Sequence, residues 1–429
     1  MVNKMSKKNK VSRRTFILSG ILASLSGFWA YKNRHKIYPW VKYPYIHYLD
    51  DRPNIIMIAM DTLRADHLGC YGYHRNISPN IDAFSKDSVL YWNTMSQSNW
   101  TLPAFCSLFT SRYPHSHATG IGVDKDRKAI LSSLSKNLIT LTDILNTKGY
   151  YNVAFTGGYY VSKMSGLNKG FREFYEISRN LTATPNDLPW QIENATTWIK
   201  KNSKHKRFFL FMHSYECHGP YVAPKKYIDI IDPHYQGPLL TGNLRKDLRI
   251  NNKFRKPTEI EIKRYNTFYD AEILFSDSLL GDFFYLLKDL DIYDNSLIIF
   301  LSDHGEEFYD HKKWEHRQTM YEEMLRVPII IKFPNGIKTG INTKRLARLI
   351  DIMPTILYDI LEIPKDRFNM EGKPLSEQLD NDEISISESS MSFEGIDMFA
   401  FRNDNLKYII KRNGTIYLTK QIKRKEVTC

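Results

Sequence analysis

Apolar residues along this chain fall into two alternating kinds of segment. Short runs of consecutive apolar residues predict buried strands at 54–60, 151–155, 208–213, 297–301 and 327–333. Segments with apolar residues every three or four positions predict helices at 81–88, 103–110, 139–148, 190–201, 259–287 and 348–361. Strands that alternate with helices of this length are typical of a mostly parallel sheet covered on both faces. We therefore predict an α/β fold from residue 52 onward.

Two of these strands lead directly into acidic residues. Asp61 follows the strand 54–60, and Asp303 and His304 follow the strand 297–301 after a single serine. Because ligands of an open parallel sheet collect beyond the carboxyl ends of its strands, these side chains can meet at one place. Two carboxylates and an imidazole suit a divalent metal ion. The alternative, that each Asp caps the following helix, stays open for Asp61.

A third candidate stands at the start of the helix 103–110. Thr101 comes just before Pro103, which fits the first turn of a helix. A hydroxyl at this point lies in the positive field of the helix N-terminus, where anions bind readily. Two interpretations are open: Thr101 is a simple N-cap, or it is a metal-activated nucleophile that attacks an anionic ester.

Composition and charge narrow the class of protein. With 429 residues and 42% hydrophobic content, the chain can bury one large core and a smaller appendage. The net charge is +13, but residues 1–36 hold nine Lys and Arg and no acid, which leaves only +4 for the rest. A body so nearly balanced argues against nucleic acid as a partner. The four cysteines are widely spaced and form no zinc motif.

Residues 1–36 predict an export signal. Basic residues precede an apolar run from Phe16 to Tyr31, which is short for a membrane span. Ser12–Leu18 resembles a twin-arginine signal, and an ordinary signal anchor is the alternative. No clean cleavage site follows. We therefore expect an exported, periplasmic or extracytoplasmic protein, anchored to the cytoplasmic membrane by this segment, with residues 37–51 as a linker.

Motifs spread over about residues 52–379 together resemble the sulfatase family of the alkaline phosphatase superfamily. In chain order they are Arg52–Asp61, Leu68–Gly72, Ser78–Asp82, Thr101–Pro114, Ser302–Glu306, Tyr321–Pro328, Asp351–Thr355 and Glu371–Leu375. Each is weak alone, and their shared order is specific. The resemblance implies an alkaline-phosphatase-like, mostly parallel sheet flanked by helices in residues 52–365. It also implies a small C-terminal α+β subdomain in residues 366–429.

The chain departs from the family pattern at the nucleophile. Sulfatases carry Cys or Ser where Thr101 stands, in a Cys/Ser-x-Pro-x-Arg motif that becomes formylglycine, and Phe105 replaces the Arg here. Threonine cannot form that aldehyde, because its secondary alcohol would oxidise to a ketone. Thr62 also replaces the second of two consecutive Asp residues. We therefore expect no formylglycine in this protein.

A threonine at this position is similar to the sites of lipoteichoic acid synthases and phosphoethanolamine transferases. That similarity implies one divalent ion, Mn²⁺, Mg²⁺ or Ca²⁺, bound by Asp61, Thr101, Asp303 and His304. The family resemblance further implies His218 and His316 as catalytic residues beside Thr101, and His213 and Arg317 as substrate-binding residues.

The function expected from the sequence is that of a metalloenzyme that cleaves or transfers a sulfate or phosphate ester through Thr101. Its substrate would be a glycan or a lipid headgroup. Two alternatives are a phosphoethanolamine- or glycerol-phosphate-type transferase acting on envelope lipids or glycans, and a non-catalytic binding protein on the same fold.

Overall fold

The computed structural model describes residues 52–123, 129–177, 187–204, 206–250, 253–377, 383–391, 396–403, 406–411 and 416–420. They belong to one compact unit. The expected signal segment 1–36 and linker 37–51 lie outside the described residues. Among the helices that the structure does describe, none is long and apolar enough to cross a membrane.

An eight-stranded sheet forms the centre of the fold, in the order β15-β2-β14-β11-β1-β8-β6-β7. Its strands are β1 (Asn54–Met60), β2 (Val89–Tyr91), β6 (Tyr151–Thr156), β7 (Glu173–Glu176), β8 (Phe208–Ser214), β11 (Ser296–Ser302), β14 (Ile329–Lys332) and β15 (Ile341–Thr343). Among these strands only β14 runs antiparallel to its neighbours. The predicted α/β architecture with a mostly parallel sheet is confirmed.

Strand register brings the site residues to one edge of this sheet. Met60 at the end of β1 pairs with Ser302 of β11 on one side and with Ser214 of β8 on the other. The three central strands therefore end level with one another. Asp61 and Asp303, each the first residue beyond its strand, leave the sheet at the same height.

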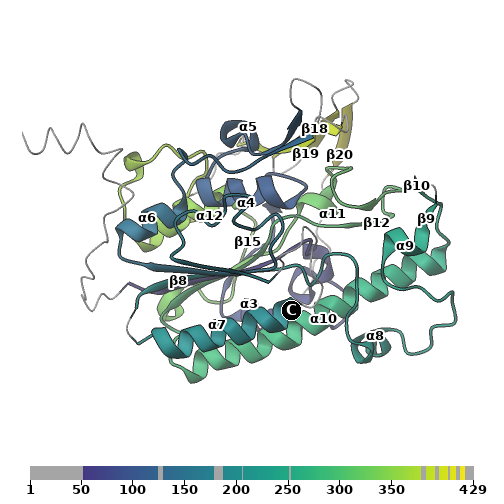
Figure 1. The fold of residues 1–429 in the computed structure, drawn as a ribbon, viewed down its shortest axis with the longest axis horizontal. Coiled ribbons are helices and arrows are strands. Elements are labelled where there is room, and N and C mark those ends of the chain that lie inside the picture. Colours follow the sequence, from purple (N-terminus) through teal and green to yellow (C-terminus); the bar gives the residue numbers. More distant parts are fainter. Residues whose placement is uncertain are drawn as a thin grey trace, which may run out of the picture. The chain divides into compact units, whose positions relative to one another are not determined.

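Helices cover both faces of the sheet (Figure 1). One face carries α4 (Thr101–Thr110), α6 (Leu141–Thr147) and α12 (Ile352–Pro354), and the other carries α3 (Pro79–Lys86), α7 (Leu188–Asn202) and α10 (Glu259–Asp289). Successive side chains of β1 alternate between the two apolar cores, with Met57 in one and Ile58 in the other. Because both faces are buried, the strand reads as an unbroken apolar run.

The helix expected at 348–361 is present but irregular, and it consists of three consecutive segments of different helix type. They are η4 (Leu349–Asp351), α12 and the π-helical η5 (Thr355–Ile360). Pro354 has no N–H to donate, and the Thr355 hydroxyl donates to the carbonyl of Asp351 at 2.6 Å. Both features interrupt a regular helix ladder.

A second sheet has six strands in the order β20-β19-β18-β17-β4-β5. Its strands are β4 (Gly120–Val123), β5 (Ala129–Ser132), β17 (Ser385–Met391), β18 (Ile396–Arg402), β19 (Leu406–Lys411) and β20 (Ile416–Lys420). Strands β4 and β5 come from within residues 52–365, so the expected boundary at 366 does not separate this sheet. Among the described residues beyond 361, helix is limited to η6 (Lys365–Arg367), so the C-terminal part is nearly all β rather than α+β.

The second sheet also contacts the segment that leads into α4. The Glu388 N–H on β17 donates to the carbonyl of Gln97, and the Ser98 hydroxyl donates to the carbonyl of Glu388 at 2.8 Å. The C-terminal strands therefore support the chain just before Thr101.

Shorter elements complete the described structure. They are η1 (Ala65–His67), η2 (Gly69–Tyr71), β3 (Thr94–Met95), α5 (Pro114–His117), α8 (Lys225–Ile231), α9 (Leu244–Leu248), β9 (Arg249–Ile250), β10 (Lys253–Phe254), β12 (Glu307–Phe308), β13 (Trp314–Glu315), α11 (Glu322–Leu325), η3 (Pro334–Gly336) and β16 (Ala347–Arg348).

Candidate active site

Four of the residues singled out in the sequence meet at the carboxyl edge of the central sheet. Asp61 follows β1, Asp303 and His304 follow β11, and Thr101 is the first residue of α4. The Thr101 hydroxyl donates to Asp61 Oδ2 at 3.2 Å and lies 3.3 Å from His304 Nε2. All four side chains are buried. The hydroxyl therefore touches both the acid and the imidazole of the group.

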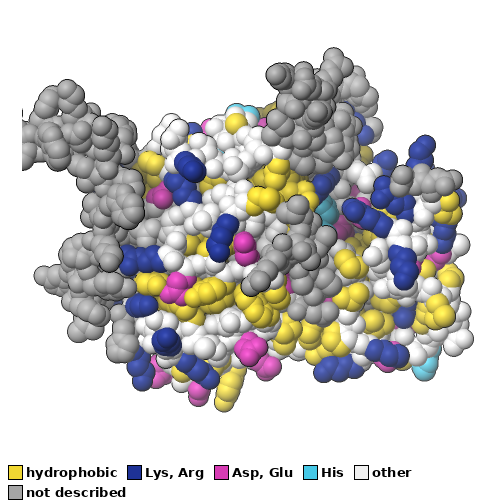
Figure 2. Space-filling view, viewed as in Figure 1, with side chains coloured by type: hydrophobic (Ala, Val, Ile, Leu, Met, Phe, Trp, Pro, Cys, Tyr) yellow, Lys and Arg dark blue, Asp and Glu magenta, His cyan; other side chains and the backbone are white. Residues whose placement is uncertain are grey.

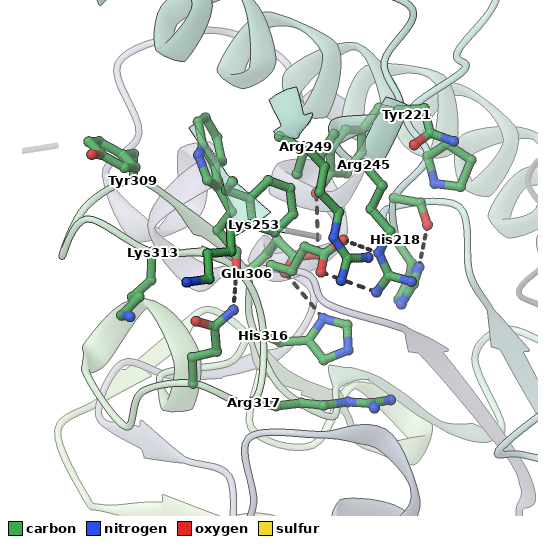
Figure 3. Close-up of a pocket in the computed structure, with 18 of the residues that line it drawn as sticks. His218, Tyr221, Arg245, Arg249, Lys253, Glu306, Tyr309, Lys313, His316 and Arg317 are labelled. Atoms are coloured by element: carbon green, nitrogen blue, oxygen red, sulfur yellow. Dashed lines mark hydrogen bonds and ion pairs between the residues drawn. The ribbon is translucent and has the colours of Figure 1, made fainter. Parts of the chain in front are cut away.

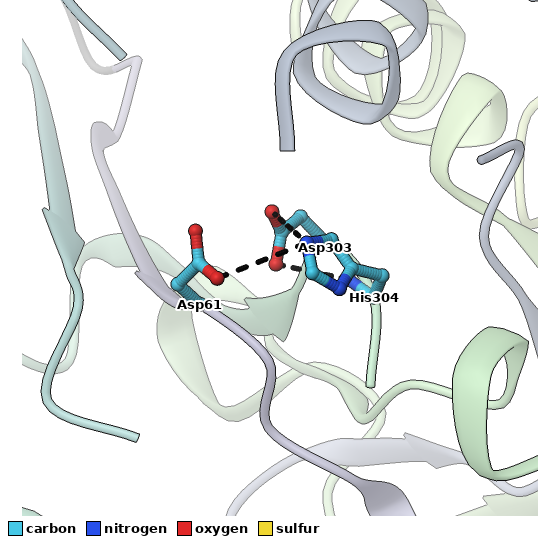
Figure 4. A group of neighbouring side chains, drawn as sticks. All are labelled: Asp61, Asp303 and His304. Atoms are coloured by element: carbon cyan, nitrogen blue, oxygen red, sulfur yellow. Dashed lines mark hydrogen bonds and ion pairs between the residues drawn. The ribbon is translucent and has the colours of Figure 1, made fainter. Parts of the chain in front are cut away.

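The oxygen and nitrogen atoms of this group fit a divalent metal ion. Asp61 Oδ1 and Asp303 Oδ2 are buried without a hydrogen-bond partner. His304 Nδ1 donates to the carbonyl of Gly305 at 2.9 Å, which leaves the lone pair of Nε2 to face the carboxylates. Nε2 is 3.4 Å from Asp303 Oδ2 and 3.8 Å from Asp61 Oδ1 (Figure 4). Unpartnered buried oxygens beside a free imidazole nitrogen are a suitable donor set for Mn²⁺, Mg²⁺ or Ca²⁺.

The electrostatics of the group also favour a bound divalent cation. Burial opposes ionisation of Asp61, but the hydrogen bond from His213 and the attraction of the neighbouring histidines in their protonated forms outweigh it and hold its pKa below the usual range. Burial and the charge of Asp61 raise the pKa of Asp303 well above its usual range. Burial lowers the pKa of His304 to about 4, so its imidazole is neutral at neutral pH. The group lacks the positive charge that would let both carboxylates ionise together.

His213 differs from its expected role in substrate binding. Its Nε2 donates to Asp61 Oδ2 at 3.3 Å, and its fully buried ring packs edge-on against Phe105 and Tyr215. His213 therefore orients the Asp61 carboxylate from behind and does not reach the pocket. Thr62 likewise turns away from the group, because its hydroxyl donates to the carbonyl of Cys217 at 2.7 Å.

A pocket of about 960 Å³ opens beside the group, and three predicted site residues line it. These are His218, His316 and Arg317, which come from two loops at the same edge of the sheet (Figure 3). The ring centroid of His316 is 4.7 Å from that of His304 and 5.1 Å from that of His218. The three histidines therefore form a continuous path from the Asp–His group to the pocket.

His316 is held by Glu306, which the sequence did not single out for this purpose. His316 Nδ1 lies 3.2 Å from Glu306 Oε1. Burial lowers the pKa of His316 well below its usual range and raises the pKa of Glu306 well above its own. Both shifts favour the uncharged forms of the two side chains.

Arg317 presents its guanidinium group without a carboxylate partner among the described residues. The group lies over the rings of Trp100 and Tyr160, at 5.4 and 5.2 Å from the ring centroids. Trp100 is the residue before Thr101, so the cation stands close to the nucleophile candidate. A planar cation held on aromatic rings is well suited to grip an anionic group.

Sequence reasoning missed the basic wall of the pocket. Arg245, Arg249, Lys253 and Arg255 all line it. The high density of Lys and Arg between 245 and 256 was a usable signal, but nothing local shows that this segment lies beside residues 309–318.

A second cluster of possible metal ligands combines Glu307, His311 and Glu323. It is a weaker candidate, because His311 is 39% exposed and already forms an ion pair with Glu323. The Thr319 hydroxyl donates to Glu307 Oε1 at 2.5 Å. These contacts already satisfy some of the nitrogen and oxygen atoms that would otherwise bind an ion.

Known proteins resemble this chain in sequence and in fold. The family model Sulfatase matches residues 53–358. An ulvan-active sulfatase of Formosa agariphila is 27% identical over 389 residues, covering 83% of this chain and 70% of that protein. An arylsulfatase of Clostridium perfringens is 25% identical over 388 residues, covering 76% of this chain and 79% of that protein. The solved phosphonate monoester hydrolase of Agrobacterium radiobacter has a TM-score of 0.70 at 18% identity, covering 86% of this chain and 89% of that one. Since the family model spans well over half of its length and the fold agrees, this chain belongs to the sulfatase family of the alkaline phosphatase superfamily.

Proposed function

We propose that this protein is a metal-dependent hydrolase of sulfate esters in which the Thr101 hydroxyl is the nucleophile. The observation that carries the proposal is the contact of Thr101 Oγ1 with both Asp61 and His304 at the N-terminus of α4. The names of the relatives, an ulvan-active sulfatase and an arylsulfatase, support sulfate as the ester group. Thr101 stands where formylglycine-forming sulfatases carry Cys or Ser, which supports a reaction that proceeds without formylglycine.

The residues around Thr101 divide the work of the reaction. A divalent ion held by Asp61, Asp303 and His304 would lower the pKa of the hydroxyl and offset charge on the ester oxygens. The Thr101 proton moves to Asp61 Oδ2, which already accepts its hydrogen bond. A bond then forms between Thr101 Oγ1 and sulfur, while the bond from sulfur to the leaving alcohol oxygen breaks.

His218 and Arg317 act on the opposite side of the ester. His218 Nδ1 donates to the carbonyl of Gly219 at 2.6 Å, which leaves Nε2 to exchange a proton with the leaving oxygen. Arg317 holds the non-bridging oxygens. Deprotonated His218 then takes a proton from a water molecule, whose oxygen bonds to sulfur while the bond from sulfur to Thr101 Oγ1 breaks. The proton held by Asp61 returns to Thr101 Oγ1, and sulfate is released.

A phosphate ester is the second candidate substrate, and the identity of the nucleophile is what favours it. An unmodified alcohol attacks phosphorus in the same in-line geometry and leaves a phosphothreonine. If a second alcohol replaced water in the last step, the same site would act as a transferase. The residues and their roles stay the same in each case.

The test compares wild type with Thr101→Val and Thr101→Ser in the presence of Mn²⁺, Mg²⁺ or Ca²⁺. Aryl sulfate, aryl phosphate and aryl phosphodiester serve as substrates. We expect sulfate hydrolysis, a loss of at least about a thousandfold in the valine variant, and partial activity in the serine variant. Tryptic mass spectrometry of the trapped enzyme should place the adduct on Thr101. A valine variant as active as wild type would exclude the hydroxyl as nucleophile, and turnover of phosphate alone would support the second candidate.

We also propose that the protein is exported and held at the cytoplasmic membrane by residues 1–36. The Arg13-Arg14 pair in a basic segment before an apolar run supports this assignment. Replacing both arginines by lysine keeps the charge and should retain the protein in the cytoplasm if the twin-arginine signal is used. Unchanged export of that variant would favour an ordinary signal anchor.

A further inference from the structure

The pocket beside the Asp–His group is far larger than one sulfate group requires, and its walls are strongly basic. Seven Lys and Arg residues line it, against two Glu and no Asp. Residues 37–429 carry a net charge of only +4, so this concentration of positive charge is local and does not reflect the overall composition. Figure 2 shows Lys and Arg side chains gathered at the end of the molecule where α9, β9 and β10 lie in Figure 1.

Most of this charge is not neutralised by neighbouring acids. Arg245 pairs with Glu315 at 2.8 Å, and Arg255 forms an ion pair with Glu261. The remaining five cations have no ion-pair partner among the described residues; they are Arg249, Lys253, Lys312, Lys313 and Arg317. Glu306 is buried and contacts His316 and Tyr221, and it forms no ion pair with any of these five cations.

These five cations fall into two groups by position. Arg317 lies with Trp100 and Tyr160 next to Thr101, where it serves the ester under attack. Arg249 and Lys253 come from the two-stranded β9–β10 segment, and Figure 3 shows Arg249 well away from Arg317 and His316 across the pocket. Lys312 and Lys313 lie in the loop between β12 and β13. One small ester cannot contact both groups.

Aromatic side chains also line this pocket. Tyr159, Tyr160 and Tyr309 line the same pocket and are partly or largely buried. Aromatic faces with hydrogen-bonding edges suit the apolar faces and hydroxyl groups of a sugar ring. The pocket therefore offers one anion site at Arg317, a lining for sugar rings, and further cations beyond it.

We propose that Arg249, Lys253, Lys312 and Lys313 form a second anion subsite, which makes the preferred substrate an acidic oligosaccharide. The subsite would bind a sulfate or carboxylate group on a sugar next to the one that carries the scissile ester. This inference rests on the proposed function, since it assigns the neighbouring ester to Thr101. It goes beyond that function in stating that the substrate carries at least two negative groups.

The experiment measures binding rather than turnover, so that it does not depend on finding the natural ester. Full-length Thr101→Val protein with Mn²⁺ is titrated calorimetrically with a heparin-derived tetrasaccharide, with tetragalacturonate and with neutral cellotetraose. The same titrations are made with Arg249→Gln/Lys253→Gln added. The matched control adds Lys136→Gln/Lys344→Gln, which removes two exposed charges outside the pocket.

We expect the acidic tetrasaccharides to bind and the neutral one to bind weakly or not at all. Loss of Arg249 and Lys253 should weaken acidic tetrasaccharide binding about tenfold, since each contact of an anion with an exposed cation contributes modestly. The salt dependence of binding should also become shallower. The control variant should bind as the parent does.

Each result decides the proposal. Equal losses in the subsite and control variants would mean a general effect of surface charge and would overturn it. Equal affinity for charged and neutral tetrasaccharides would overturn it as well. If wild type cleaves no ester at all, the proposed function fails, while the binding comparison still decides whether the anion subsite exists.

Discussion

Asp303→Asn should have opposite effects on stability with and without metal. In the metal-free protein, burial and the charge of Asp61 raise the pKa of Asp303 well above its ordinary value of 3.8. A carboxyl group with a raised pKa takes up a proton on folding, so its contribution to stability falls as the pH rises above that ordinary value. Asparagine does not titrate. The metal-free variant should therefore be more stable than the metal-free wild type at pH 8.

The structure explains why asparagine fits at this position. Asp303 Oδ1 accepts hydrogen bonds from the N–H groups of His304 at 2.9 Å and Thr62 at 3.3 Å, and an asparagine carbonyl can accept both. Its amide group would then occupy the place of Oδ2, the atom that has no hydrogen-bond partner. That position would present two N–H donors to the cation instead of a negative oxygen.

Asp303→Asn should therefore weaken the binding of Mn²⁺. Changes even to groups that only support a metal ligand weaken metal affinity by about 10–100-fold, so loss of a ligand oxygen should raise the Kd for Mn²⁺ at least about a hundredfold, or about 3 kcal/mol. Wild type with free Mn²⁺ about a thousandfold above its Kd gains about 4 kcal/mol of stability. At that concentration the variant should be the less stable of the two proteins.

Urea unfolding at pH 8, with EDTA and with Mn²⁺, measures both effects, and calorimetry measures the affinity. Glu307→Gln is the matched control, because it makes the same change in the second cluster and should leave the Mn²⁺ affinity unaltered. Equal stabilisation of wild type and Asp303→Asn by Mn²⁺ would refute the reasoning. Loss of Mn²⁺ binding in Glu307→Gln alone would place the ion in the second cluster.

Three further predictions concern the surroundings of the site. Burial raises the pKa of Glu216 from 4.5 to about 7, so its contribution to stability is lost as the pH rises through that interval. In urea unfolding, Glu216→Gln should therefore increase stability by up to about 3 kcal/mol at pH 8 and by little at pH 4.5. Equal effects at both pH values would contradict this. Arg317→Lys should raise the KM for a sulfate ester about tenfold and change kcat less, because lysine loses the planar stacking on Trp100 and the bidentate grip; a fall confined to kcat would speak for a different role. In Gly305→Ala the new Cβ would lie 1.9 Å from the carbonyl oxygen of Glu323, so the loop that holds His304 must shift. We expect a loss of at least about 2 kcal/mol of stability and weaker Mn²⁺ binding. An unchanged melting temperature and an unchanged Mn²⁺ affinity would show that the loop adapts freely.

The centre of the site was predictable because it depends on short-range features. Asp61 and Asp303 each end an unbroken apolar strand, and parallel strands deliver their next residues to one edge of the sheet. The place of His213 was also accessible in principle. It stands two residues after Phe211 on β8, so both side chains point to the face beneath α4, where Phe105 meets the His213 ring.

Other features depend on contacts between distant segments. The basic wall joins residues 245–255 to residues 309–318, and the second sheet joins β17 to β4 through the pairing of Met391 with Ile121. Neither pairing leaves a periodic pattern in the sequence. Family resemblance indicated a C-terminal subdomain, but only the structure shows that its sheet is completed by β4 and β5 from the first third of the chain.

The two backbone contacts between β17 and the segment at 97–98 have a consequence for biosynthesis. Ribosomes make the chain from its N-terminus, so every proposed catalytic residue emerges before the strand that supports Thr101. A shortened chain ending at residue 384 would retain all of them and still lack that support. Activity should therefore require synthesis of β17 in addition to synthesis of the catalytic residues.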